Sequence, residues 1–377
     1  MPLVKEMYPL VDAHQDVAWS MLAYSRPFAS PPSNFMLTES SWRHSGLKWA
    51  WCTLFVLPDY VAQGIAKRAI SVQFEIYWNL LAHYSGWLVP IGERANIGLI
   101  GEFGGQTGLS VLLEGADAIE SPAELDEYFL NGVRAMSLTW HHTNRYAGGD
   151  SGKGGVTEEG RLLLDEAARL GIAIDVSHLN RESFWDLVEY RTKRMPSLRI
   201  YASHANAAAV CAHERNLDDS QLSALREAGG CVGIVLLNGY IKAGWIDTDF
   251  GAKKMPPIEE VLPPSRPPAY IAANLVESAK HGARLEDAVN DAQPQEEVEL
   301  ELLLDHIDHM RDVLGEDRIG IGSDLDGGLT RFNTPVGIND LSDLQSLGSL
   351  IEDRWDRDFA KKVMGENMME FWARSLP

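Results

Sequence analysis

His14 and Asp16, near the start of the chain, are two side chains of metal-binding type that follow a largely apolar segment, residues 8–13. Alternate residues of an extended strand point to the same side, so both side chains can bind one cation. A histidine satisfied in the core and an aspartate that caps a helix explain the pair equally well. This segment on its own leaves both interpretations open.

Glu114 is a single acidic residue directly after the apolar run at 110–113. An unpaired carboxylate is costly to bury, so Glu114 needs a positively charged partner. A pair of metal ions bridged by the carboxylate meets this need, and a salt bridge meets it as well.

His178 and His204 repeat one arrangement, because each ends an apolar, strand-like segment with the dipeptide Ser-His. Neutral imidazole is the commonest metal ligand, and catalytic residues of α/β barrels gather at the carboxyl ends of the strands. One such histidine is more often structural, but the repetition favours a metal site.

Asp324 and Asp326 follow a further apolar segment, within the glycine-rich residues 320–328. Glycine allows the backbone to approach a ligand closely. We expect one of the two acids to act as a general base. A calcium loop is the alternative, which the lack of further oxygen ligands at regular spacing disfavours.

These residues require elements that bring them together. Short apolar segments rich in β-branched residues alternate with amphipathic stretches such as 158–170 and 219–228, a pattern typical of parallel strands joined by helices. The eight expected strands are residues 8–13, 51–56, 109–113, 135–139, 173–176, 200–202, 232–236 and 319–322. Eight strands favour an α/β fold of the (β/α)8 TIM-like barrel type over an open sheet.

Residues 241–297 interrupt this alternation with prolines at positions 256, 257, 263, 264, 267 and 268 and with a polar stretch near 291–297. We interpret them as an insertion within a single hydrolase domain that spans residues 1–377. Long loops of a barrel lie on its catalytic face, so the insertion is either a lid that controls specificity or a surface decoration.

The composition narrows the class of protein. The 33 basic and 54 acidic residues give a net charge of −21, which disfavours binding to nucleic acid and favours retention of cations. Three cysteines without a C-x-x-C motif argue against a disulfide scaffold or a thiolate zinc site. With no apolar run long enough for a signal peptide or a membrane span, we expect a cytoplasmic protein that binds no membrane. The oligomeric state is open, with a homodimer as one candidate.

Two further features have ordinary explanations. Residues 147–154 resemble a phosphate-binding loop, but alanine replaces the first glycine and neither Ser nor Thr follows Lys153. We interpret this segment as a flexible loop of the barrel. His306 and His309 lie three residues apart in an acidic helix, and we expect both on a solvated face.

The metal-binding candidates lie at the ends of the first, third, fifth and sixth expected strands. Their nitrogen and oxygen ligands, without sulfur, suit a catalytic pair of Zn²⁺ ions, with Mn²⁺ or Fe²⁺ as alternatives. We therefore expect a site for two divalent ions, preferably Zn²⁺, among His14, Asp16, Glu114, His178 and His204.

Five segments, in order along the chain, resemble the membrane (renal) dipeptidase family of zinc peptidases, which has an amidohydrolase-like barrel. They are residues 12–16 (DAHQD), 113–115 (LEG), 174–178 (IDVSH), 202–205 (ASHA) and 322–327 (GSDLDG). The resemblance implies that the histidine and aspartate of the first segment hold one zinc ion, and that the histidines of the third and fourth hold the second. It also implies that the glutamate bridges both ions and that Asp324 is the acid/base residue.

The resemblance extends to substrate binding. Residues 213–217 (HERNL) place Arg215 where the family receives the terminal carboxylate of the substrate, and a guanidinium suits that bidentate contact. Two departures stand out. Gln15 replaces the usual asparagine, and Trp140 stands where the mammalian enzymes have a substrate-binding histidine. Either His141 or His142 compensates, or the pocket accepts a different substrate.

The expected reaction is hydrolysis of the amide bond of a dipeptide, or of a related small N-acyl amino acid, by a metal-bridging hydroxide. An enzyme that acts on another small ester, lactone, amide or phosphoester is the alternative on the same barrel, since fold and metals do not determine the substrate. A non-catalytic metal-binding protein is a further alternative, against which the acid at position 324 argues.

Overall fold

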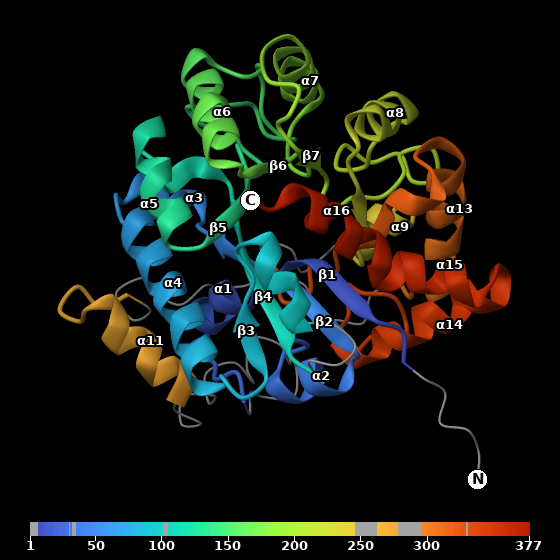
Figure 1. Cartoon of the computed structure of the whole chain (residues 1–377), viewed down its shortest axis with the longest axis horizontal. Coiled ribbons are helices and arrows are strands. Elements are labelled where there is room, and N and C mark those ends of the chain that lie inside the picture. The colour runs from blue at the N-terminus through green and yellow to red at the C-terminus, as the bar shows by residue number, and fades with distance from the viewer. Residues whose placement is uncertain are drawn as a thin grey trace.

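In the part of the chain that the structure describes, eight parallel strands form a nearly closed barrel surrounded by helices (Figure 1). The computed structural model describes residues 7–29, 31, 35–100, 105–245, 262–277, 296–328 and 331–377. The barrel strands are β1 (Leu10–Gln15), β2 (Leu47–Phe55), β4 (Thr107–Glu114), β5 (Val133–Ser137), β6 (Ala173–Asp175), β7 (Ile200–Tyr201), β8 (Val232–Ile234) and β9 (Ile319–Ile321). This arrangement confirms the (β/α)8 prediction.

The barrel closes between its two end strands. The order of hydrogen-bonded neighbours is β7-β6-β5-β4-β2-β1-β9-β8. A parallel bridge between Ala202 and Val232 then connects β7 to β8, so the sheet returns to its start. The extra strand β3 (Leu88–Pro90) pairs with β4 outside this circle. Its three residues are too short to show an alternating pattern, so the sequence did not predict it.

Helices follow the strands and cover the outside of the barrel (Figure 1). The α-helices are α1 (Val17–Ala23), α2 (Glu39–His44), α3 (Pro58–Ala62), α4 (Ala66–His83), α5 (Leu125–Leu130), α6 (Glu158–Leu170), α7 (Arg181–Arg194), α8 (Asp219–Ala228), α9 (Asn238–Ile241), α11 (Pro268–Glu277), α13 (Leu303–Val313), α14 (Leu344–Arg354), α15 (Arg357–Lys361) and α16 (Asn367–Ser375). Among these, α6 and α8 have the predicted bounds.

The ends of α6 and α8 are set by local chemistry. The side chains of Thr157 and Asp218 accept hydrogen bonds from backbone N–H groups of the first turns. Both helices end at a glycine in the left-handed conformation, Gly171 with φ 75° and Gly229 with φ 77°. These capping residues are visible in the sequence, which explains why the bounds were predictable.

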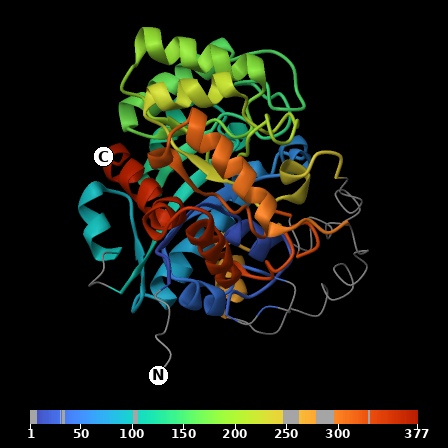
Figure 2. The same cartoon turned by 90° about the vertical axis from the view of Figure 1, so that its right-hand side faces the viewer.

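The C-terminal helix α16 closes the end of the barrel opposite to the candidate residues. The ring of Trp372 stacks on Trp51 of β2, with ring centroids 3.6 Å apart, and meets Tyr201 of β7 edge-on. In the turned view of Figure 2 the red C-terminal helix runs from the edge of the molecule towards its centre. Aromatic side chains therefore fill one end of the barrel. The candidate site residues lie at the other end, where the strands have their carboxyl ends.

The predicted insertion is only partly described. Its helix α11 packs against α4, on the outside of the barrel. Arg68 of α4 donates a hydrogen bond to the carbonyl oxygen of Pro263, at 2.6 Å. Residues 246–261 and 278–295 lie outside the described residues, so the prediction of a lid there is untested.

His306 corrects one prediction. It lies in α13 but is fully buried, whereas His309 is partly exposed and contacts Asp219. His306 Nδ1 accepts a hydrogen bond from the backbone N–H of Ala207, and Nε2 donates to the carbonyl oxygen of Ile241. The helix surface alone suggested a solvated face, but two neighbouring loops cover this position. Among the described helices, none combines the length and the apolar character that crossing a bilayer demands.

Candidate metal centre

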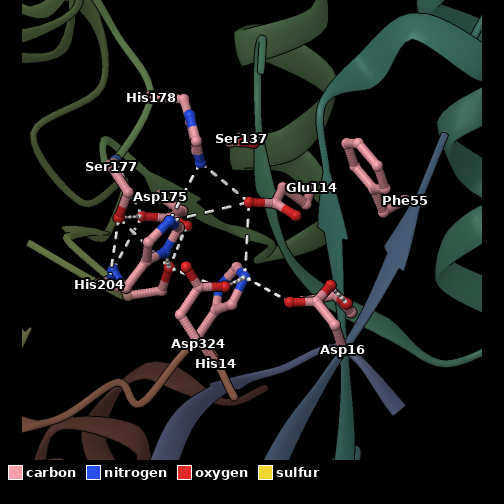
Figure 3. Close-up of polar contacts among 12 residues, drawn as sticks. His14, Asp16, Phe55, Glu114, Ser137, Asp175, Ser177, His178, His204 and Asp324 are labelled. Atoms are coloured by element: carbon pink, nitrogen blue, oxygen red, sulfur yellow. Dashed lines mark hydrogen bonds and ion pairs between the residues drawn. The ribbon is translucent and has the colours of Figure 1, made fainter. Parts of the chain in front are cut away.

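The carboxyl ends of four strands of the barrel bring the predicted ligands into one buried cluster (Figure 3). His14 is the next-to-last residue of β1, Glu114 is the last residue of β4, and His178 and His204 follow β6 and β7. All four are at most 5% exposed. The β1–β2 register is irregular between Asp12 and Gln15, next to His14, and such irregularities commonly re-aim side chains at active sites.

A single oxygen of Glu114 lies between three imidazole rings. Its Oε1 is 2.9 Å from Nε2 of His178, 3.4 Å from Nε2 of His14 and 3.8 Å from Nε2 of His204. Burial raises the pKa of Glu114, but the contacts with His14 and His178 outweigh burial and hold the pKa below its usual range. A central carboxylate with histidines on both sides has the arrangement that a ligand shared by two cations requires.

On the side of the cluster where His14 lies, two carboxylates besides Glu114 approach one imidazole ring, so negative charge is in excess there. His14 Nε2 lies 3.5 Å from Oδ2 of Asp16 and 3.7 Å from Oδ1 of Asp324. Burial and the neighbouring carboxylates of Asp16 and Glu114 raise the pKa of Asp324 well above its usual value. Within the described part of the chain, His14 Nε2 and Asp16 Oδ2 are buried without a hydrogen-bond partner. Buried carboxylates and an unpartnered imidazole nitrogen fit divalent cations.

Arg215 is buried inside the site. Its Nη2 donates to Nε2 of His204, at 2.7 Å, and to Nε2 of His178, at 3.2 Å. Its Nε lies 3.2 Å from Asp150 Oδ2, and its guanidinium carbon lies 5.5 Å from the ring centre of Tyr240. Sequence pattern alone would place this arginine on the surface, but the resemblance placed it in the pocket, where the structure has it.

Asp150 is a site residue that the sequence did not indicate. Its carboxylate contacts Nδ1 of His141 at 2.8 Å and Nδ1 of His178 at 3.3 Å, besides Arg215. These positive and hydrogen-bonding neighbours hold the pKa of Asp150 below its usual range although burial opposes them. Asp150 thus connects a candidate metal ligand to the candidate carboxylate-binding arginine.

The loop that carries Asp150 is packed, whereas we expected flexibility. A Cβ atom at Gly149 would lie 2.1 Å from the carbonyl oxygen of Trp140, and one at Gly148 would lie 2.2 Å from that of Gly154. Only glycine permits this close approach of backbones. The adjacent glycines were the available signal for a tightly packed segment next to the site.

Asp324 and Asp326 have different surroundings. Asp324 lines the pocket, but Asp326 accepts hydrogen bonds from the guanidinium of Arg26 and from the backbone N–H groups of Met36 and Leu37. Arg26 is fully buried. Asp326 therefore anchors a loop, and of the two acids only Asp324 is placed to meet a substrate.

The candidate substrate-binding residues differ in their positions. Trp140 and His141 line the pocket, whereas His142 is exposed and is not among the lining residues. Burial lowers the pKa of His141 to about 4, although its contact with Asp150 opposes this shift. The pocket is lined by Asp16, Trp19, Phe55, Glu114, Trp140, His141, His178, His204, Arg215, Leu237, Tyr240, Asp324 and Gly327.

Several known proteins are similar to this chain in sequence or in structure. An uncharacterized protein in the pqqA 5′ region of Klebsiella pneumoniae is 26% identical over 273 residues, which cover 70% of this chain and 79% of that protein. Dipeptidase aclJ of Aspergillus oryzae is 26% identical over 326 residues, which cover 81% of this chain and 62% of that protein. A metallo peptidase from Rhodobacter sphaeroides, solved with a phosphinate mimic of the dipeptide L-Ala-D-Ala, is 22% identical with a TM-score of 0.76, covering 98% of this chain and 100% of that chain.

The family assignment rests on the whole chain. The family model described as membrane dipeptidase (Peptidase family M19) matches residues 2–375. The Rhodobacter structure independently shows the same fold over nearly the full length. The clustered imidazoles and carboxylates agree with metal-dependent chemistry. The chain therefore belongs to the membrane dipeptidase family, Peptidase family M19, and is a metal-dependent hydrolase of peptide bonds.

Proposed function

We propose that the chain hydrolyses dipeptides, or related small N-acyl amino acids, at a centre for two divalent ions, preferably Zn²⁺. The observation that carries the proposal is the position of Glu114 Oε1, within 3.8 Å of Nε2 of three histidines. His14 and Asp16 would hold one ion, His178 and His204 the other, and Glu114 both. Two ions held there would polarise the scissile carbonyl and lower the pKa of a water molecule so that it attacks at neutral pH.

Arg215 is the group proposed to bind the free carboxylate of the substrate. It is buried, its Nη1 atom has no hydrogen-bond partner among the described residues, and Asp150 holds its Nε. Because Nη2 already contacts His178 and His204, Nη1 is the group left to donate to a substrate carboxylate. The substrate would thereby be oriented with its amide bond towards Glu114 and the histidines.

Asp324 is the proposed proton carrier. It lines the pocket, and its Oδ1 lies 3.7 Å from Nε2 of His14. In this position it can accept a proton from the attacking water and pass the proton to the leaving amine, as general base and then general acid. Asp326 cannot replace it without breaking its contact with Arg26.

Two relatives support the dipeptide assignment. The Aspergillus relative carries the name dipeptidase, and the Rhodobacter structure holds a phosphinate mimic of a dipeptide. Trp140 supports a second candidate for the substrate, namely another small amide, ester, lactone or phosphoester. Its indole ring contacts Phe55 and His141 in the pocket wall and so narrows the space for a substrate.

Elemental analysis and a substrate panel test this proposal. Metal-replete wild type should contain close to two divalent ions per chain, and His178→Ala should contain fewer. Dipeptides of both stereochemical series should be hydrolysed faster than lactones and phosphoesters of similar size. A wild type that stays near zero metal after reconstitution with zinc or manganese would overturn the proposal.

We further propose a cytoplasmic location, and a homodimer is one candidate for the assembly. The net charge of −21 favours solubility and keeps separate molecules from associating without a specific interface. Cell fractionation tests the location, and light scattering during size-exclusion chromatography tests the assembly.

A further inference from the structure

We propose that Ser203 is a positioning residue which sets the tautomer of one histidine at each of the two proposed ion positions, and so couples both positions through one hydroxyl group. The inference rests on the proposed two-ion centre. Ser203 is fully buried and precedes His204 at the end of β7. No role for it follows from the ligand set, because its hydroxyl lies on the far side of the imidazole rings from Glu114.

The hydroxyl group of Ser203 contacts two different histidines. Its Oγ lies 2.9 Å from Nδ1 of His14, at the end of β1, and 2.8 Å from Nδ1 of His204. It also lies 2.5 Å from Oδ2 of Asp175, the last residue of β6. A hydroxyl has one proton to donate and two lone pairs with which to accept. The Oγ of Ser177 lies farther away, at 3.2 Å, and its own proton goes to Asp175. The three closer contacts therefore use the full hydrogen-bonding capacity of the Ser203 hydroxyl.

Asp175 determines the direction of these hydrogen bonds. Its Oδ1 accepts from the backbone N–H groups of Ser177 and Ser203, at 3.0 and 2.9 Å, and from the Ser177 hydroxyl at 2.6 Å. A carboxylate surrounded by donors acts as an acceptor, so the single proton of the Ser203 hydroxyl goes to Oδ2. Both lone pairs of the Ser203 oxygen then accept, and both histidines must donate from Nδ1–H.

The consequence for His14 and His204 is a defined tautomer. With the proton on Nδ1, the neutral ring presents the lone pair of Nε2 to the centre. An independent contact agrees, because Arg215, which can only donate, contacts Nε2 of His204 at 2.7 Å. On the other ring, Nε2 of His14 is the buried atom without a hydrogen-bond partner among the described residues. Both nitrogen atoms that face Glu114 are thus prepared to bind cations.

No neighbouring group in the described part of the site can orient both histidines in place of Ser203. The Ser177 hydroxyl donates to Asp175 and accepts from the backbone N–H of His204, so it has no bond to an imidazole ring. His14, Asp175 and His204 have the composition of a metal site, but they surround the Ser203 hydroxyl, which hydrogen-bonds all three. His178 is oriented separately, since its Nδ1 contacts Asp150 at 3.3 Å. Ser203 therefore serves both ion positions and Asp150 serves one.

Cobalt(II) supplies a probe that reports on the tautomers directly. In the cobalt-loaded wild type, proton NMR in H₂O should show three paramagnetically shifted signals that disappear in D₂O, one from each Nδ1–H of His14, His178 and His204. Fewer than three would mean that a histidine binds through Nδ1, which would overturn the proposal. This measurement requires no variant and separates orientation of the rings from general stability.

Ser203→Ala tests the coupling of the two positions. It should remove or broaden two of the three signals and should weaken binding of both cobalt ions by about ten- to a hundredfold in competition with a chelator, the usual cost of losing such a partner. Asp150→Asn should weaken the ion at His178 and His204 alone. The matched control is Ser323→Ala, because Ser323 is equally buried and donates to Asp12 at 2.5 Å without contacting an imidazole ring. Its two cobalt affinities should stay within about threefold of wild type.

The outcomes separate the two proposals. A wild type that binds no cobalt pair contradicts the proposed function. A wild type that binds two ions, with Ser203→Ala equal to it or with only one ion weakened, contradicts the role of Ser203 and leaves the proposed function standing. Equal losses in Ser203→Ala and Ser323→Ala, with all three signals retained, would show that Ser203 contributes stability alone.

Discussion

Asp324 and Asp326 are separated by one residue and share a left-handed backbone conformation, with φ 59° and 63°. Their side chains nevertheless have different tasks. Asp326 is held by Arg26 and two backbone N–H groups, whereas Asp324 faces the pocket next to His14 and Asp16. A left-handed backbone is unusual for residues other than glycine. Both acids share it, so their different tasks follow from their partners and not from their backbone conformation.

Asp324→Asn should reduce kcat by about 100- to 10,000-fold, the usual scale for general acid/base catalysis. Asparagine keeps the size of the side chain but cannot accept the proton of water. Metal content should stay near that of wild type, as measured by elemental analysis on the same sample. Loss of metal together with activity would instead make Asp324 a ligand, and full activity in a metallated variant would remove its catalytic role.

Arg215→Met should raise KM for dipeptides with a free C-terminus by about ten- to a hundredfold, because a charge-assisted contact worth about 1.5 to 3 kcal/mol is lost. Steady-state kinetics with C-terminally amidated dipeptides provide the control, since these lack the carboxylate and should change little. An equal loss on both substrate types would show that Arg215 acts through its contacts with Asp150 and the histidines.

At the scale of elements, the loop between β5 and α6 depends on close backbone packing. Gly149→Ala would place a methyl group 2.1 Å from the carbonyl oxygen of Trp140, so the loop must shift and carry Asp150 with it. We expect a loss of about 1 to 3 kcal/mol in the free energy of unfolding, together with weaker metal binding. Urea titration and chelator competition measure the two effects.

Gly86→Ala is the matched control for that variant. A Cβ atom at Gly86 meets nothing within 4 Å, so its stability and metal affinity should stay near those of wild type. If Gly149→Ala were as stable and as well metallated as this control, the packed loop would not position Asp150.

Helix α13 is held to two loops by His306. Burial lowers the pKa of His306, so the folded state favours the neutral ring. The stability that this ring contributes is present above the unfolded pKa of about 6.5 and is lost as the pH falls from there through the lower folded pKa. His306→Gln, whose amide can still accept from Ala207 and donate to Ile241, should therefore lose less stability between pH 7.5 and pH 5.5 than wild type. Denaturant titration at both pH values measures this, and parallel losses would contradict it.

At the scale of the whole molecule, the site joins strands that are distant in sequence. The candidate ligands lie at or just after the carboxyl ends of β1, β4, β6 and β7. Three carboxylates lie within 3.7 Å of the same imidazole nitrogen of His14. Without cations, this buried negative charge opposes closure of the barrel. A cation that binds the folded state but not the unfolded state stabilises the folded state. The stabilisation grows with the logarithm of the ratio of cation concentration to Kd.

Chelation should accordingly lower the melting temperature. Zinc at a thousand times its Kd should stabilise the fold by about 4 kcal/mol per site, provided that the unfolded chain does not bind it. Calorimetry with zinc and with a chelator measures the difference, which should be smaller in His178→Ala. Identical melting of the zinc-loaded and zinc-free wild type would show that the cluster is not a metal site.

The sequence by itself determined the fold class and indicated most of the candidate ligands. Apolar segments of strand length, separated by capped helices such as α6 and α8, specify a barrel because local periodicity and capping are short-range properties. The strand-end histidines were visible for the same reason, since position at a strand end is itself a local feature. The resemblance to a known family then indicated which of these residues would share a metal ion.

Only the tertiary structure decided which residues surround those ligands. Ser203, Asp175 and Asp150 gain their roles through contacts with side chains 28 to 189 positions away along the chain, and no local pattern encodes such contacts. The burial of His306, the separation of Asp324 from Asp326 and the packed loop at Gly149 have the same origin. The direction of a hydrogen bond and the burial of a side chain depend on neighbours that only closure of the barrel brings together. For this reason the linear sequence does not reveal either property.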